Sequence, residues 1–252
     1  MVEWRDKAII LEATKFADND AIVTVFSREH GIYKGICKGA LSKRRRADIE
    51  CGNIAQVHWN ARLQEHLGKL HLQIETGIVA RVITDRLKLT TLGALCSLLK
   101  SSLPEHDPHP ALYDAVEDFL QHMAEATEPF DWLSHYIALE VRLLEELGFG
   151  LDLTQCVATG GRENLTHVSP KSGRAVSAAA AAPYVDKLLP LPHFLKGGIS
   201  STNWAEMADG LRLSAHFIEH WLLSAVDKPL SPIRNRLGQQ VARYLPLPVS
   251  NS

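Results

Sequence analysis

The chain has 252 residues, of which 46% are hydrophobic and 22% charged, and its formal net charge is -2 at pH 7. This composition supplies enough apolar material for one large domain or two smaller ones. A sequence pI of about 6.6 excludes a uniformly basic nucleic-acid-binding protein, so any site for a polyanion must be a local patch.

Membrane and secretory signals are absent from the sequence pattern. No apolar run approaches the ~20 residues of a membrane-spanning helix, and the N-terminus "MVEWRDKAII" lacks the charge and apolar pattern of a signal peptide. The four cysteines form no C-x-x-C pair, which suits a reducing compartment. We therefore expect a cytoplasmic protein that does not contact a membrane.

The first 80 residues are predicted to form five short strands. Alternation is clearest in "NIAQVHWNA", which places Ala55, Val57 and Trp59 on one face and His58 on the other. Five strands in this length suit a small closed barrel of the OB type, although a fragment of a sandwich would show similar alternation. The predicted strands are residues 7–13, 21–27, 31–38, 53–61 and 68–76.

After about residue 80 the apolar pattern takes a helical period. Apolar stripes predict helices in residues 84–102, 112–123 and 132–148. Asn203 and Glu206 resemble a capping box that begins a long helix through Leu222, and a short terminal helix follows in residues 233–245. We therefore predict an α+β protein with a barrel in residues 1–80 and a mainly helical domain in residues 81–252.

A turn-rich insertion in residues 151–183 interrupts the predicted helical domain. Zinc ribbons hold their metal with two C-x-x-C pairs separated by a spacer of about 15–20 residues. The matching positions here are Cys156, Thr159, Ser177 and Ala180, so only one of the four carries a thiol. The spacing resembles a zinc ribbon that has lost its cysteines, and we expect neither zinc nor another cofactor.

The sequence "HFIEH" offers an alternative in the enzyme class. His216 and His220 stand four residues apart on one helix face with Glu219 beside them, as in the zinc-binding pattern H-x-x-E-H of some metallohydrolases. A third protein ligand is missing downstream, so a solvated helix face is the simpler interpretation. A metallohydrolase that uses His216, Glu219 and His220 remains the alternative function.

The strongest charge feature is the segment from Arg28 to Arg46, which holds seven basic residues and one acid. Strand alternation in "GIYKGICKG" places Tyr33 inside the barrel and Lys34 and Lys38 on its outer surface. The run from Lys43 to Arg46 follows in a predicted loop, where flexible cations suit contacts with successive phosphates. A solvated basic loop is the alternative, and the combination favours single-stranded nucleic acid.

Three segments together resemble the RecO family of bacterial DNA-repair and recombination mediators. They are "GIYKGICKGALSKRRRA", "LLEELGFGLDLTQCVATG" and "VSPKSGRAV", and the resemblance extends over nearly the whole chain in matching order. It implies an OB-fold followed by a helical domain with a small insertion that binds zinc in some members. The chain departs from that zinc ladder at three of its four positions.

The resemblance also implies a function and partners. It implies binding of single- and double-stranded DNA, annealing of complementary strands, association with the nucleoid, and no catalytic residue. With RecR, such a protein would load RecA onto DNA covered by single-strand-binding protein, whose C-terminal tail it would grip. The DNA role carries over to Arg28, Lys34, Lys38, Lys43, Arg44, Arg45 and Arg46.

The residues that grip the partner tail are not identified by the sequence. Arg142, Arg212 and Arg234 are candidates that the sequence does not rank. A scaffold that binds proteins without DNA is a third hypothesis, and a DNA mobility shift would discriminate it from the first.

Overall fold

A computed structural model describes residues 1–197 and 203–245. It divides into two compact units, Met1–Glu125 and Ala126–Ser252, which are described separately below. The domain boundary expected at residue 80 lies inside the first unit. None of the described helices is long and apolar enough to cross a bilayer.

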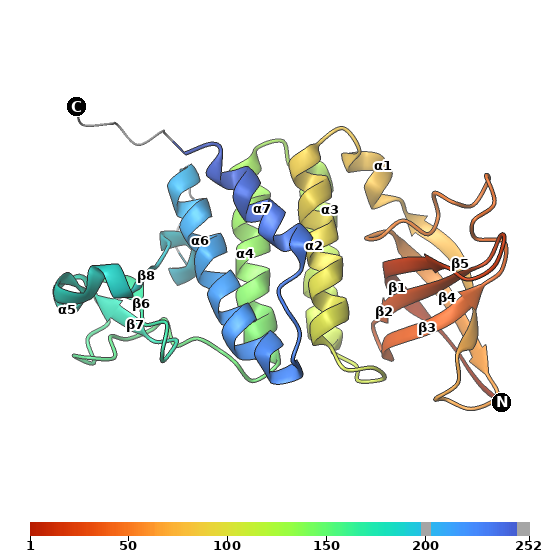
Figure 1. The fold of residues 1–252 in the computed structure, drawn as a ribbon, viewed down its shortest axis with the longest axis horizontal. Helices are drawn as coiled ribbons and strands as arrows, with labels where there is room; N and C mark the ends of the chain where they lie inside the picture. Colours follow the sequence, from red (N-terminus) through yellow and green to blue (C-terminus); the bar gives the residue numbers. More distant parts are fainter. Residues whose placement is uncertain (198–202, 246–252) are drawn as a thin grey trace. The chain divides into compact units, whose positions relative to one another are not determined.

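The first unit begins with a closed five-stranded barrel, which confirms the predicted OB-type architecture (Figure 1). The strands follow the order β1-β2-β3-β5-β4, in which β3 and β5 are parallel and the other neighbours antiparallel. Each predicted strand is present, and the first is longer than predicted. The bounds are β1 (Val2–Lys15), β2 (Ala21–Ser27), β3 (Gly31–Cys37), β4 (Ile54–Ala61) and β5 (Gly68–Thr76).

The long first strand pairs with two different neighbours. Residues 2–9 pair with β4 and residues 8–15 with β2, and a register shift lies between Ile10 and Glu12 within the pairing with β2. Such a bulge bends a strand and lets a sheet close on itself. The predicted alternation then places Val57, Trp59 and Tyr33 in the barrel core, as expected.

The barrel closes at a narrow seam between β3 and β5. Gly35 pairs with Gly68 there, and Ile36 pairs with Lys69. A Cβ atom added at Gly68 would lie 2.3 Å from the Trp59 ring, and one at Gly35 would lie 2.9 Å from the Leu70 Cβ. β3 can approach β5 this closely because Gly35 has no side chain, and the missing side chain of Gly68 leaves room for the Trp59 ring of β4.

Three helices complete the first unit: α1 (Ile78–Val82), α2 (Arg86–Ser102) and α3 (Pro110–Glu125). The Asp85 side chain caps α2 by accepting hydrogen bonds from the backbone N–H groups of Leu87 and Lys88. The Phe26 ring on the outer side of β2 packs edge-on against Tyr113 of α3. The helical part therefore covers part of the barrel surface.

The second unit contains α4 (Pro129–Glu146), α6 (Trp204–Phe217) and α7 (Pro232–Ala242) (Figure 1). The insertion lies between α4 and α6 in the sequence. The Asn203 side chain accepts a hydrogen bond from the Ala205 N–H, which confirms the predicted N-cap of α6. The insertion forms a small sheet in the order β7-β6-β8. Its elements are β6 (Leu165–Val168), β7 (Ala175–Ser177), α5 (Ala178–Ala181), η1 (Ala182–Lys187), β8 (Leu189–Pro190) and η2 (His193–Lys196).

The long helix predicted through Leu222 is present, but its last part is not α-helical. The α-helix ends at Phe217 and continues as a π-helical turn, η3 (Ile218–Leu223), and a 3₁₀ turn, η4 (Ser224–Val226). The His220 Nδ1 atom lies 2.9 Å from the His216 carbonyl oxygen, which is the acceptor that an α-helical turn would offer to the His220 N–H. This competition for one acceptor accompanies the wider turn.

A charged network lies in the core of the second unit and joins α4, α6 and α7. The Arg234 guanidinium donates from Nε to Glu140 Oε1 at 2.6 Å and from Nη2 to Glu140 Oε2 at 2.8 Å. The hydroxyls of Tyr136 and Ser214 also donate to the Glu140 carboxylate, each at 2.6 Å. Arg234 and Glu140 are only 2% and 1% exposed, so both charges depend on this pairing.

Candidate nucleic-acid interface

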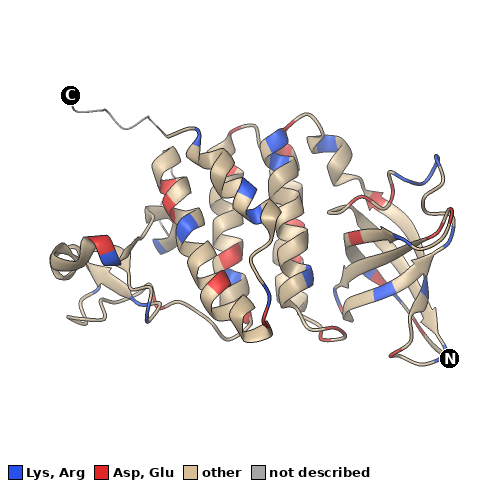
Figure 2. Cartoon of the chain, in the orientation of Figure 1, with Lys and Arg blue, Asp and Glu red and all other residues tan. Residues whose placement is uncertain are grey.

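The connection from β3 to β4 begins with the basic loop, which we define as residues 38–46. It folds as successive turns. Ser42 donates from its backbone N–H and its Oγ to the Gly39 carbonyl, and the backbone N–H groups of Arg45 and Arg46 donate to the Ser42 carbonyl. Gly39 has a positive φ of 65°, which glycine adopts without strain. Figure 2 shows Lys and Arg residues along this loop at one end of the barrel.

Four side chains of the basic loop carry charges that the fold does not use. Lys38, Lys43, Arg44 and Arg46 are exposed. Among residues 1–197 and 203–245, their side chains form no ion pair or hydrogen bond. These cations are therefore available to a polyanion.

Arg45 differs from its neighbours because it holds the loop in shape. Its Nη1 atom donates to the Lys38 carbonyl at 3.1 Å, and its Nε lies 3.7 Å from the Asp48 Oδ2. Its Nη2 also lies 3.9 Å from the Cys37 sulfur. We therefore expect Arg45 to position the other cations as well as to add charge.

Arg28 and Lys34 lie outside the loop, and both are paired with acids of the helical part. Arg28 donates from Nε and Nη2 to the two Asp114 carboxylate oxygens at 2.7 and 2.9 Å, and this contact raises its pKa. Lys34 forms an ion pair with Glu105 in the segment between α2 and α3. A phosphate would have to compete with these carboxylates.

Lys69 is a basic residue that the sequence reasoning did not assign to this surface. It lies opposite Ile36 across the parallel seam, so it joins Lys34 and Lys38 on the outer face of the barrel. The sequence shows that Lys69 alternates with apolar residues. It does not show that β5 pairs with β3, and this pairing is what brings the three lysines together.

In the insertion, a thiol and hydroxyls converge at three of the four ladder positions. Cys156 is buried, and its sulfur accepts a hydrogen bond from the Ser177 N–H at 3.3 Å. Hydrogen bonds from the hydroxyls of Ser177 and Thr159 and from the Ser177 N–H lower the pKa of the Cys156 thiol to about 6. The Ser177 N–H thus bonds directly to Cys156, and the hydroxyls of Thr159 and Ser177 stabilise its thiolate form. Ala180 has no polar side-chain atom with which to take part.

The two histidines of "HFIEH" stack on each other, with their ring centroids 4.4 Å apart. The His216 Nε2 atom lies 3.3 Å from the Pro170 carbonyl oxygen, and the His220 Nδ1 atom faces the His216 carbonyl. Over the described part of the chain, no group of three or more His, Cys, Asp or Glu side chains is placed to hold a metal ion. The metallohydrolase alternative therefore gains no ligand set from this geometry.

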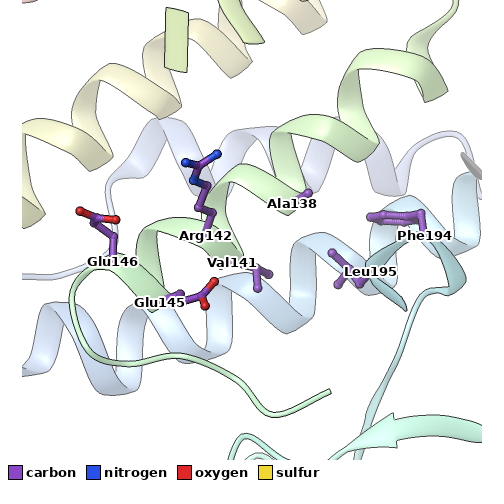
Figure 3. A pocket seen from close by; sticks show the side chains of 7 residues that line it. All are labelled: Ala138, Val141, Arg142, Glu145, Glu146, Phe194 and Leu195. Atoms are coloured by element: carbon purple, nitrogen blue, oxygen red, sulfur yellow. The ribbon is translucent and has the colours of Figure 1, made fainter. Parts of the chain in front are cut away.

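The three arginines considered for a partner tail have different surroundings. Arg234 is buried against Glu140 and has a structural role, and Arg212 is exposed and pairs with Asp209 at 2.9 Å. Arg142 lines a cavity of the second unit (Figure 3). Figure 3 shows Arg142, Glu145 and Glu146 at one end of that lining and Phe194 and Leu195 at the other.

The fold and its basic loop define an α+β protein whose N-terminal barrel is of the OB type. Family models described as "Recombination protein O N terminal" and "Recombination protein O C terminal" match residues 1–76 and 83–228. The chain belongs to the RecO family, and the protein has a role in DNA repair and recombination.

Curated relatives cover almost the whole chain. A DNA repair protein RecO of Rhodospirillum rubrum is 38% identical over 247 residues, which are 97% of this chain and 98% of the relative. One of Rhodospirillum centenum is 40% identical over 245 residues, which are 96% and 95%. One of Hyphomonas neptunium is 38% identical over 242 residues, which are 95% and 98%.

Proposed function

We propose that the protein binds single- and double-stranded DNA through the basic loop and the adjoining lysines, and anneals complementary strands. The observation that carries this proposal is the set of four exposed cations on one loop, which have no acidic partner in the described structure. The proposed DNA contacts are Arg28, Lys34, Lys38, Lys43, Arg44, Arg45 and Arg46. Lys69 extends them along the outer face of the barrel.

The proposed mechanism needs no covalent step. Each lysine or arginine that neutralises a phosphate releases a counterion, and this release favours binding without regard to base sequence. Two strands that are held on one screened surface repel each other less, so their complementary bases pair more readily.

We further propose that the protein works with RecR to load RecA onto DNA covered by single-strand-binding protein, in the cytoplasm and at the nucleoid. The cavity beside Arg142 supports a contact with the acidic, apolar-ended tail of single-strand-binding protein, because it combines a cation with Phe194 and Leu195. Glu145 and Glu146 line the same cavity, so we expect the tail carboxylates to approach on the side of Arg142.

We also propose that the insertion folds without zinc. The hydrogen bond from the Ser177 N–H to Cys156 and the residues at the other ladder positions support this, because hydroxyls occupy positions where a metal site needs thiolates or imidazoles. Dialysis against a strong chelator should leave the melting temperature unchanged, and metal analysis should find no stoichiometric zinc. Zinc at one ion per chain, with a fall in melting temperature after chelation, would contradict this proposal.

A salt series tests the DNA-binding proposal. We expect the triple variant Lys43→Ala, Arg44→Ala, Arg46→Ala to lose affinity for both DNA forms and to anneal strands more slowly. The slope of log affinity against log salt should fall by about 2 for single strands, since each lost phosphate contact removes about 0.7. Mobility shifts and fluorescence annealing at four salt concentrations measure both effects.

A matched control removes three exposed cations of the insertion: Arg162→Ala, Lys171→Ala, Lys187→Ala. It changes the net charge by the same amount and should leave affinity and annealing close to wild type. Equal losses in both triple variants would contradict a site in the basic loop, because they would show that only net charge matters.

A further inference from the structure

The turn between β1 and β2 exposes an aromatic ring beside the basic loop. The Phe16 and Ala17 N–H groups both donate to the Asp20 carbonyl, at 3.0 and 3.2 Å, which closes the turn. Phe16 is nevertheless 53% exposed. Single exposed apolar side chains are common on protein surfaces, so what distinguishes Phe16 is its position beside the basic loop.

Hydrogen bonds fix this turn to the beginning of the basic loop. The Leu41 N–H donates to the Asn19 carbonyl at 2.9 Å, and the Gly39 N–H donates to the Asp20 Oδ1 at 2.8 Å. The exposed ring and the exposed cations therefore belong to one connected surface. A ligand that contacts Lys38 or Lys43 is held close to Phe16.

The outer face of the barrel continues this surface from Phe16. A row of residues that face outward crosses four strands through the pairs Thr14 with Ile22, Ile22 with Ile36, and Ile36 with Lys69. Ile22 and Ile36 are only half-buried. Because Phe16 still pairs with Asp20, strand alternation places it on the same face as Thr14.

The resulting pattern is an apolar strip bordered by cations. Phe16, Ile22 and Ile36 provide the apolar contacts, while Lys38 and Lys69 lie beside them on the same face. An uncharged, apolar protein surface would satisfy the apolar part and leave the lysines and the basic loop without acidic partners. Single-stranded DNA satisfies both parts at once, because its bases are apolar on their faces and its phosphates repeat along the chain.

We propose that Phe16 is a base-stacking residue for single-stranded DNA, with the phosphates on the basic loop and the bases over Phe16, Ile22 and Ile36. This inference rests on the proposed DNA binding by the basic loop and adds a preference for single strands. Duplex bases are stacked on one another and present no free face, so they gain nothing from the ring. The exposed carboxylate of Asp18 in the same turn repels phosphates, which favours the base as the group that faces Phe16.

The test compares three labelled ligands in fluorescence anisotropy: oligo-dT, an abasic oligomer with the same number of phosphates, and a duplex. Phe16→Ala should weaken oligo-dT binding by about tenfold, within the range measured for one stacked base. Its affinity for the abasic oligomer and the duplex, and its salt dependence, should match wild type. Phe16→Trp should bind oligo-dT at least as tightly as wild type. This result would show that the loss in Phe16→Ala comes from the missing aromatic face and not from substitution at this position as such.

Ile83→Ala is the matched control, because Ile83 is an apolar side chain of the same unit with 62% exposure and lies outside the strip. It should bind all three ligands as wild type does. Wild-type affinity of Phe16→Ala for oligo-dT, or an equal loss for all three ligands, would overturn the stacking role. Failure of the underlying function is distinguishable, since the wild-type protein would then bind none of the ligands in a salt-dependent way.

Discussion

The barrel and the second unit differ in the polar side chains that they bury. In residues 1–76, all of which are described, the buried polar side chains are neutral: Thr24, Ser27 and Asn53. The second unit buries Glu140 and Arg234 as a hydrogen-bonded ion pair. The difference shows that the role of a charged residue follows from the partner within its reach. Arg234 holds helices together, while Arg44 is left for a ligand.

The largest expected effect comes from breaking the buried ion pair. Glu140→Leu leaves the Arg234 guanidinium buried without its counterion, so we expect a loss of about 3–5 kcal/mol in the free energy of unfolding. The double variant Glu140→Leu, Arg234→Met should recover most of this loss, because it removes both charges. Urea unfolding measures both variants. If Glu140→Leu lowers the free energy of unfolding by less than about 1 kcal/mol, the network contributes little to the stability of this unit.

The stability of the barrel should fall when a methyl group is added at its seam. Gly68→Ala places a Cβ atom 2.3 Å from the Trp59 ring, which donates from Nε1 to the Lys34 carbonyl. We expect a loss of about 1–3 kcal/mol in the free energy of unfolding, typical of an overpacked core. Gly77→Ala is the control, since its new Cβ would have its nearest neighbour at 3.9 Å. Thermal unfolding that does not separate the two variants would mean that the seam opens readily.

The surface cations should divide into two groups. Arg44→Gln removes a guanidinium with no partner in the described structure, so DNA affinity and its salt dependence should both fall, the slope by about 0.7–0.9. Arg28→Gln should cost less affinity, because the Arg28 guanidinium is already engaged by Asp114. Titrations of both variants across a salt series compare them. An equal loss would indicate that Arg28 leaves Asp114 when DNA binds.

The smallest expected effect is a pH dependence in the insertion. The pKa of the Cys156 thiol is lowered to about 6, against an ordinary value of about 8.5 in the unfolded chain. A lowered pKa stabilises the fold fully above about pH 8.5, and this contribution disappears as the pH falls through about 6. Thiolate absorbance should therefore rise near pH 6 in the wild type and not in Cys156→Ser. Stability differences between the two proteins should grow from pH 5 to pH 9.

Much of the fold was predictable because residues close together in the sequence determine its strands and helix ends. Alternation and β-branched runs located all five strands, alternation placed Tyr33 and Trp59 in the core, and the Asn203 cap located the start of α6. The π-helical turn after Phe217 was missed because it depends on where the His220 ring lies. The small sheet of the insertion was missed because its strands are too short to show alternation.

The candidate site was predictable in its charge and not in its pairing. The basic run from Lys43 to Arg46 is visible in the sequence as a local excess of cations. The acid partners of Arg28 and Lys34 are 86 and 71 residues away, and that of Arg234 is 94 residues away. Only the tertiary fold brings such residues together. The sequence alone therefore did not distinguish the cations that are paired with acids from those that are exposed without an acidic partner.

The seam of the barrel also bears on how the protein can be divided. Only two residues of β3 pair with β5, while the backbone of Glu105 and His106 lies along Ile32 at the remaining edge, with the His106 N–H donating to the Ile32 carbonyl at 3.1 Å. A fragment that stops at residue 80 would leave this strand edge open to pairing with other molecules, which promotes aggregation. A fragment that extends to Glu125 keeps the edge covered, so it is the smaller piece suited to isolation in solution.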